Sequence, residues 1–155
     1  MAVEIERKFL LRNNTWRDVA DDGLCMRQGY LTGSGKASVR VRVAGDEANI
    51  NIKSATIGIA RQEYEFPLPL GEANEMLDSL TEGPLIEKTR YHVRHGKHVW
   101  EIDVFAGDNQ GLVVAEIELN DAQEGFDRPD WLGEEVSTDS RYYNAALVKH
   151  PFKNW

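Results

Sequence analysis

Residues 37–54 read ASVRVRVAGDEANINIKS, two alternating runs joined by a short segment that contains glycine. Valine alternates with arginine over Ala37–Ala44, and isoleucine alternates with asparagine and lysine over Ala48–Ser54. A period of two is typical of a β-strand with one apolar and one polar face. Residues 45–47 (GDE) favour a turn, so the whole stretch predicts a β-hairpin.

The same alternation recurs on both sides of this hairpin. Further strands are expected at Val3–Leu11, Met26–Thr32, Ala60–Leu68, Leu85–Arg94, Val99–Phe105 and Leu112–Asn120. Glycine-containing segments at residues 33–36 and 95–97 predict two more tight turns. Eight sequential strands at this spacing predict an antiparallel meander, either closed as a barrel or split as a sandwich.

Two segments break the alternation. Apolar residues recur at steps of three and four over Leu70–Leu80, which predicts a short helix. A last helix is expected from an N-cap at Asp139 or Ser140 to about Lys149, because Pro151 stops it. No linker or repeat divides the sequence, so residues 1–155 are expected to form one domain.

The composition excludes several classes of protein. The 18 basic and 26 acidic residues give a net charge of −8, which opposes an extended contact with nucleic acid. No apolar run approaches the roughly 20 residues that cross a bilayer, and the N-terminus is charged where a signal peptide is apolar. We therefore expect a cytoplasmic protein without a membrane partner. Cys25 is the only cysteine, which excludes disulfides and predicts a small core residue.

Pairs of like charge occupy the polar faces of the expected strands. The two members of each pair are two residues apart, or roughly 6.5–7 Å along a strand. These pairs are Glu4/Glu6, Arg40/Arg42, Glu63/Glu65, Lys88/Arg90, Glu101/Asp103 and Glu116/Glu118. A solvated face usually mixes signs so that neighbouring side chains pair across strands. Repeated like charges instead indicate ligands of opposite charge.

The two signs of charge suit two kinds of ligand. Clustered carboxylates favour a hard divalent cation such as Mg²⁺ or Mn²⁺, bound through oxygen. Clustered arginine and lysine favour phosphate. Both clusters on one concave surface would form a metal–polyphosphate site. A closed sheet of about eight strands leaves room inside for side chains and one small ligand.

The order of these residues resembles a known family. Residues 4–8 (EIERK) form an ExExK motif. It is followed, in this order, by Arg40-x-Arg42, Lys53, Glu63-x-Glu65, Lys88-x-Arg90, Asp103 and Glu116-x-Glu118. From Val3 to the last helix the chain is similar to CYTH-domain proteins, the triphosphate tunnel metalloenzymes. The resemblance implies a mainly β fold, an eight-stranded antiparallel closed barrel with a few short helices outside and at the C-terminus.

The resemblance also implies an activity. The short bacterial members that this chain resembles most are similar to tripolyphosphatases, which use Mg²⁺ or Mn²⁺ to hydrolyse inorganic tripolyphosphate to pyrophosphate and phosphate. An adenylate cyclase, or a nucleoside or thiamine triphosphatase, is an alternative on the same fold. A polyphosphate-binding module without catalysis is a further alternative. A small-molecule triphosphate is the expected partner, and the protein is expected to be a monomer or a homodimer.

Each charged residue receives a role from the resemblance. The implied metal ligands are Glu4, Glu6, Asp103, Glu116 and Glu118. The implied substrate-binding cations are Lys8, Arg40, Arg42, Lys53, Lys88 and Arg90, with Arg141 as the candidate from the last helix. Of these cations, the expected catalytic residues are Lys8, Lys88 and Arg90. A second metal site, or charge balance for neighbouring cations, is the expected role of Glu63, Glu65 and Glu101.

Overall fold

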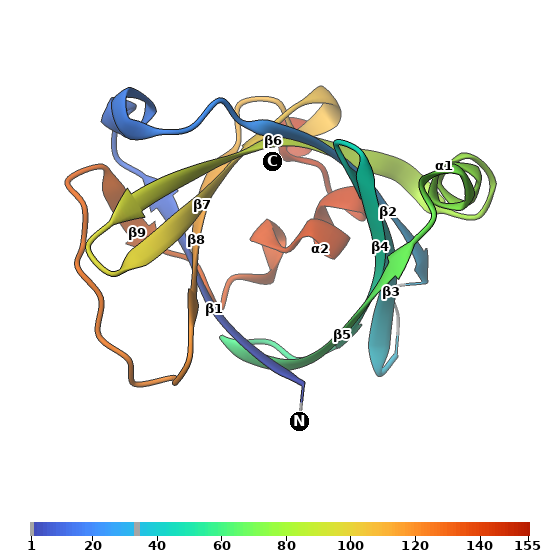
Figure 1. Ribbon diagram of the computed structural model, residues 1–155, viewed down its shortest axis with the longest axis horizontal. Coiled ribbons are helices and arrows are strands. Elements are labelled where there is room, and N and C mark those ends of the chain that lie inside the picture. The colour runs from blue at the N-terminus through green and yellow to red at the C-terminus, as the bar shows by residue number, and fades with distance from the viewer. Residues whose placement is uncertain (1, 33–34) are drawn as a thin grey trace.

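The computed structural model describes residues 2–32 and 35–155, in which eight antiparallel strands close into a barrel (Figure 1). The strands are β1 (Val3–Leu11), β2 (Leu24–Thr32), β3 (Ala37–Ala44), β4 (Glu47–Ser54), β5 (Ala60–Leu68), β6 (Glu82–His95), β7 (His98–Phe105) and β8 (Val113–Leu119). Their order around the ring is β5-β4-β3-β2-β6-β7-β8-β1, and β1 pairs with β5 to close it. The closed barrel is confirmed, and the sandwich is wrong. The turn expected at 33–36 includes residues 33 and 34, which lie outside the described residues.

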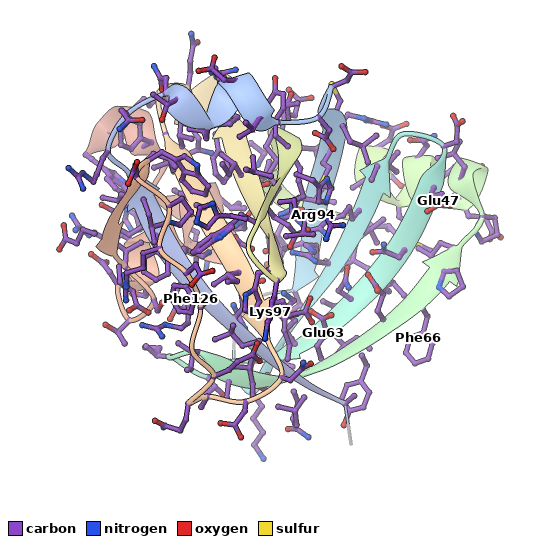
Figure 2. All side chains as sticks on the ribbon, turned by 60° about the vertical axis from the view of Figure 1, so that its left-hand side comes forward. Glu47, Glu63, Phe66, Arg94, Lys97 and Phe126 are labelled. Carbon is purple, nitrogen blue, oxygen red and sulfur yellow. The ribbon has the colours of Figure 1, made fainter. Side chains whose placement is uncertain are left out.

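Alternation along each strand separates an inner polar face from an outer apolar face. On β5, Glu63 lines the interior cavity, whereas Phe66 points away from the barrel and is 53% exposed (Figure 2). Pairing keeps the polar faces together, since Lys53 of β4 lies opposite Glu63 and Asn51 lies opposite Glu65. The charged faces of the expected strands therefore point into the barrel.

The hydrophobic core lies mainly between the outer face of the barrel and the segments that cover it. Helix α1 (Leu70–Ser79) packs Ala73 and Leu77 against Val41 and Val43 of β3. On another side, Phe9 and Trp100 are fully buried beneath Trp131 and the segment that leads to it. Because most of the interior is polar, burial of these outer faces supplies most of the hydrophobic stabilisation.

One end of the barrel interior is apolar and is covered by helix α2 (Asn144–Lys149). Ile86, Phe105 and Val114 alternate with the outer-face residues of their strands, so they point inward. Leu147 of α2 packs against these three side chains and is 1% exposed. Figure 1 shows α2 within the ring when the barrel is viewed along its axis. The helix therefore closes this end of the interior.

Several short elements complete the chain. The 3-10 helices are η1 (Thr15–Val19), η2 (Gly107–Asn109), η3 (Ser140–Tyr142) and η4 (Phe152–Asn154). A ninth strand, β9 (Leu132–Glu135), pairs with the end of β1 and was not expected, because its four residues do not alternate. None of the helices in residues 2–32 and 35–155 is long and apolar enough to cross a membrane.

Two expectations from the sequence are wrong. The expected helix after Asp139 is divided into η3 and α2, because Tyr143 between them is extended, with ψ 137°. The hydroxyl of Tyr143 fixes this break: it donates to Ser137 O at 2.6 Å and accepts from Gly58 N at 3.2 Å. Cys25 is exposed rather than part of the core.

Candidate active site

The inner faces of the eight strands surround one cavity of about 510 Å³. Nearly every charged residue singled out in the sequence lines it: Glu4, Glu6, Lys8, Arg40, Arg42, Lys53, Glu63, Glu65, Lys88, Arg90, Glu101, Glu116 and Glu118. Asp103 lies directly behind this lining, fully buried against Lys88 and Arg90. The strand register thus gathers residues from positions 4 to 118 into one site.

Asp103 holds two cations in a buried cluster. One carboxylate oxygen accepts from Arg90 Nε at 2.8 Å, and the other accepts from Lys88 Nζ at 2.7 Å and from Arg90 Nη2 at 2.9 Å. Burial would raise the pKa of Asp103, but Lys88 and Arg90 outweigh it and lower the pKa to about 2. Burial lowers the pKa of Lys88 to about 7 despite the attraction of Asp103. Both oxygens of Asp103 are therefore engaged by cations.

Three other carboxylates meet beside this cluster, and Arg90 lies 2.8 Å from Glu101 and 3.8 Å from Glu116. Glu6, Glu101 and Glu116 can bring one carboxylate oxygen each within 4.8 Å of one another. Burial raises the pKa of Glu6 well above its usual value, and the nearby charges of Glu116 and Glu4 raise it further. Carboxylate oxygens at this spacing are ligands that Mg²⁺ and Mn²⁺ prefer, so the residues present fit such an ion.

The remaining carboxylates lie beside this group. Burial raises the pKa of Glu4 to about 7, and a hydrogen bond with Glu63 adds to the shift. Lys53 Nζ lies 3.3 Å from Glu4 and 3.0 Å from Glu63. Burial, with the charges of Glu101 and Glu63, raises the pKa of the partly exposed Glu118. The carboxylates in this part of the cavity therefore outnumber the lysine that lies beside them.

Arg40 and Arg42 form a contrasting region of the cavity. Within residues 2–32 and 35–155, neither has a carboxylate oxygen within 4.0 Å. Arg40 is 6% exposed, and its Nε lacks a hydrogen-bond partner among the described residues. Burial, with the charges of Arg40 and Arg90, lowers the pKa of Arg42 to about 10. At neutral pH Arg42 therefore stays charged. The forked donors of the two guanidinium groups suit an anion such as phosphate.

Arg141, unlike Asp103 behind the lining, lies away from the cavity altogether. Its guanidinium is 62% exposed and lies 2.6 Å from Asp139, the residue that caps η3. Because Tyr143 breaks the expected helix, η3 turns Arg141 outward and α2 instead presents Lys149 to the cavity lining.

Uncharged polar residues of the site were missed in the sequence. Gln28, Asn51 and Asn144 contact Arg42, Arg40 and Lys88, respectively. Alternation places Asn51 on the polar face of its strand, which is a usable signal. The strand that contains Gln28 has no run of charged residues on one face that would mark it as part of the site. Asn144 reaches the site only because α2 covers the end of the barrel.

Comparison with known proteins agrees with this geometry. Residues 2–149 match the model of the CYTH domain. The chain belongs to the CYTH family. One CYTH relative, an inorganic triphosphatase of Acetivibrio thermocellus, is 47% identical over 100% of this chain and 99% of its own length. Another, an inorganic triphosphatase of Nitrosomonas europaea, is 42% identical over 94% of this chain and 96% of its own.

A solved structure within the same fold family is also similar over nearly the whole chain. The crystal structure of an inorganic triphosphatase shares 38% identity with this CYTH protein at a TM-score of 0.65. The match covers 93% of this chain and 96% of the solved one. The fold of this chain is therefore similar to that of the solved inorganic triphosphatase.

Proposed function

We propose that this protein is a metal-dependent hydrolase that converts inorganic tripolyphosphate to pyrophosphate and phosphate. The observation that carries the proposal is one cavity that is lined by both an arginine pair and a group of carboxylates. Among the residues that the structure describes, Arg40 and Arg42 have no carboxylate oxygen within 4.0 Å, while Glu6, Glu101 and Glu116 gather within reach of one ion. The two relatives named inorganic triphosphatases, at 47% and 42% identity, support the choice of substrate.

The carboxylate group is the proposed site for Mg²⁺ or Mn²⁺. Glu6, Glu101 and Glu116 would hold the ion, with Glu4 and Glu118 beside them. Such an ion supplies positive charge to phosphate oxygens and lowers the pKa of a water molecule. Asp103 would instead hold Lys88 and Arg90, since both of its oxygens accept hydrogen bonds from them.

The cations of the chain are the proposed substrate contacts. Phosphoryl transfer depends mostly on positioning and charge stabilisation, which fixed cations provide. Lys8 Nζ and Arg90 Nη2 lie 3.5 and 3.8 Å from Glu116, so with Lys88 they would contact the reacting phosphate beside the carboxylates. Burial lowers the pKa of Lys88, whereas the charge of Asp103 at 2.7 Å favours its protonated form. Arg40, Arg42 and Lys53 would bind the rest of the phosphate chain.

Glu63 and Glu65 are proposed to balance charge. Burial would raise the pKa of Glu63, but Glu4 and Lys53 outweigh it and lower the pKa to about 2. Glu65 accepts a hydrogen bond from Asn51. We further propose a single-domain cytoplasmic protein that is a monomer or a homodimer.

Product analysis with three compounds tests the proposed function. The protein is incubated with tripolyphosphate, pyrophosphate or ATP at matched Mg²⁺ or Mn²⁺, with EDTA as the control, and phosphate, pyrophosphate and cyclic AMP are measured. We expect equal release of pyrophosphate and phosphate from tripolyphosphate, and the highest kcat/KM for that compound. Each charged hydrogen bond that pyrophosphate or ATP fails to make costs roughly tenfold or more.

Other outcomes identify other functions. ATP hydrolysis with a kcat/KM equal to that of tripolyphosphate would identify a nucleoside triphosphatase. Cyclic AMP would identify a cyclase. Tripolyphosphate binding without any product would identify a polyphosphate-binding module and refute the proposed hydrolase.

A further inference from the structure

Two buried amide side chains hold the arginine pair of the cavity. Gln28 of β2 is fully buried, and its Oε1 accepts from Arg42 Nε at 3.0 Å. Asn51 of β4 is 2% exposed, and its Oδ1 accepts from Arg40 Nη2 at 3.1 Å. Strand register brings each amide to its arginine, because Gln28 lies opposite Arg42 and Asn51 lies opposite Arg40.

A second hydrogen bond determines which end of each amide faces its arginine. Gln28 Nε2 donates to Asn144 Oδ1 at 2.9 Å, and Asn51 Nδ2 donates to Glu65 Oε1 at 3.0 Å. Since an amide has one donor end and one acceptor end, these contacts turn its oxygen toward the guanidinium. Asn144 Oδ1 also accepts from Lys88 Nζ at 3.1 Å, so α2 is tied into the same network.

Three other strand cations of the cavity are held by carboxylates. Lys88 and Arg90 bond to Asp103, and Lys53 lies 3.0 Å from Glu63. A carboxylate that holds a cation also cancels much of its charge, whereas an amide oxygen carries no net charge. An arginine held by an amide can therefore receive phosphate without first giving up an ion pair.

We infer that Gln28 and Asn51 are positioning residues that fix Arg42 and Arg40 for phosphate and leave their charge uncompensated. The inference rests on the proposed function, because the phosphate in question is that of tripolyphosphate. A preset guanidinium loses less side-chain freedom when the anion binds, which strengthens binding. The absence of charge on each amide therefore matters as much as the hydrogen bond that it accepts.

Exchange of each amide for the acid of the same shape tests this inference. Gln28→Glu and Asn51→Asp keep an acceptor oxygen beside the arginine and add one negative charge. We expect the Kd of tripolyphosphate, measured by calorimetry in EDTA to prevent turnover, to rise about tenfold to a hundredfold. Because the added charge alone also repels phosphate, the uncharged variant Gln28→Met isolates the loss of the acceptor: a purely structural role predicts an unchanged Kd for that variant once it is folded.

The matched control is Asn109→Asp. Asn109 is also a buried amide, 4% exposed, but its Oδ1 accepts from the backbone N–H of Phe152, away from the cavity. This variant should keep the wild-type Kd. Gln28→Met removes the acceptor without adding charge and should raise the Kd less than Gln28→Glu does. It serves as the second variant at this position if the acid fails to fold by circular dichroism.

The outcomes separate this inference from the proposed function. Wild-type release of phosphate tests the function, and the ratio of variant to wild-type Kd tests the positioning role. If the wild type binds tripolyphosphate without hydrolysing it, and the variants bind it more weakly, the proposed function is refuted and the positioning role stands. Folded Gln28→Glu and Asn51→Asp proteins with a Kd within about twofold of wild type would overturn the inference.

Discussion

Asp103→Asn should destabilise the protein strongly, because it removes the charge that holds two buried cations. The carboxylate is fully buried and accepts three hydrogen bonds from Lys88 and Arg90. Asparagine has the same shape but keeps one acceptor oxygen, and its amide donors then face a cationic N–H group. Removing one partner of a buried ion pair typically costs about 3–5 kcal/mol, because the remaining charge is left uncompensated.

The three bonds do not add in full. Taken singly, each hydrogen bond to the carboxylate would contribute about 1.5–3 kcal/mol. The three bonds share one acceptor group, however, and Arg90 retains its hydrogen bond to Glu101 at 2.8 Å in the variant. We therefore expect a loss of about 3–5 kcal/mol in the free energy of unfolding. At about 2–4 °C per kcal/mol for a chain of this size, Tm should fall by about 6–20 °C.

Urea unfolding followed by tryptophan fluorescence measures this loss, with Asp108→Asn as the control. Asp108 lies 2.9 Å from Lys153, but the two side chains are 46% and 56% exposed, so the control should cost less than about 1 kcal/mol. An Asp103→Asn variant as stable as the control would refute the reasoning. The Mg²⁺ requirement for activity should stay unchanged, and a raised requirement would identify Asp103 as a metal ligand instead.

Three further predictions concern the metal and the substrate. Glu6→Gln should raise the Mg²⁺ concentration for half-maximal activity at least about tenfold. The control Glu75→Gln, on the exposed face of α1, should leave it unchanged. The same Mg²⁺ requirement in both variants would contradict the assigned metal site. Because the pKa of Glu4 is raised from 4.5 to about 7, the native protein binds more protons than the unfolded one in this range. Its Tm in EDTA should therefore fall as pH rises from 4.5 to 7, while apparent Mg²⁺ affinity rises; a Tm that rises instead would contradict the shift. Tripolyphosphate at a hundredfold excess over Kd, in EDTA to prevent turnover, should stabilise the fold by about 2.7 kcal/mol, and an unchanged melting curve would exclude an internal site.

Local alternation was enough to predict the strands and the face on which each charge lies. Val39, Val41 and Val43 against Arg40 and Arg42 define two faces, whatever the strand pairs with. Each face must then find a matching environment. The sequence alone therefore predicts a concave charged surface, although periodicity left barrel and sandwich open until the family resemblance favoured the barrel.

The details that depend on contacts between distant residues required the tertiary structure. The helix expected after Asp139 is broken at Tyr143 by hydrogen bonds to Ser137 and Gly58, and local propensity contains neither contact. As a result, Arg141 faces solvent and Lys149 reaches the cavity. A side chain near the point where a helix is interrupted can be placed only when the long-range contacts that interrupt the helix are known.

The different roles of the charged residues also follow only from the tertiary structure. In the sequence, Asp103 and Glu101 are equivalent acids two residues apart on one strand face. Strand register places Asp103 opposite Arg90, and Glu101 opposite Glu116. Both oxygens of Asp103 are therefore engaged by Lys88 and Arg90, whereas Glu101, which also pairs with Arg90, joins a group that fits a metal. The sequence determined which faces are charged, because alternation is local, but the pairing of strands decided the partner of each charge.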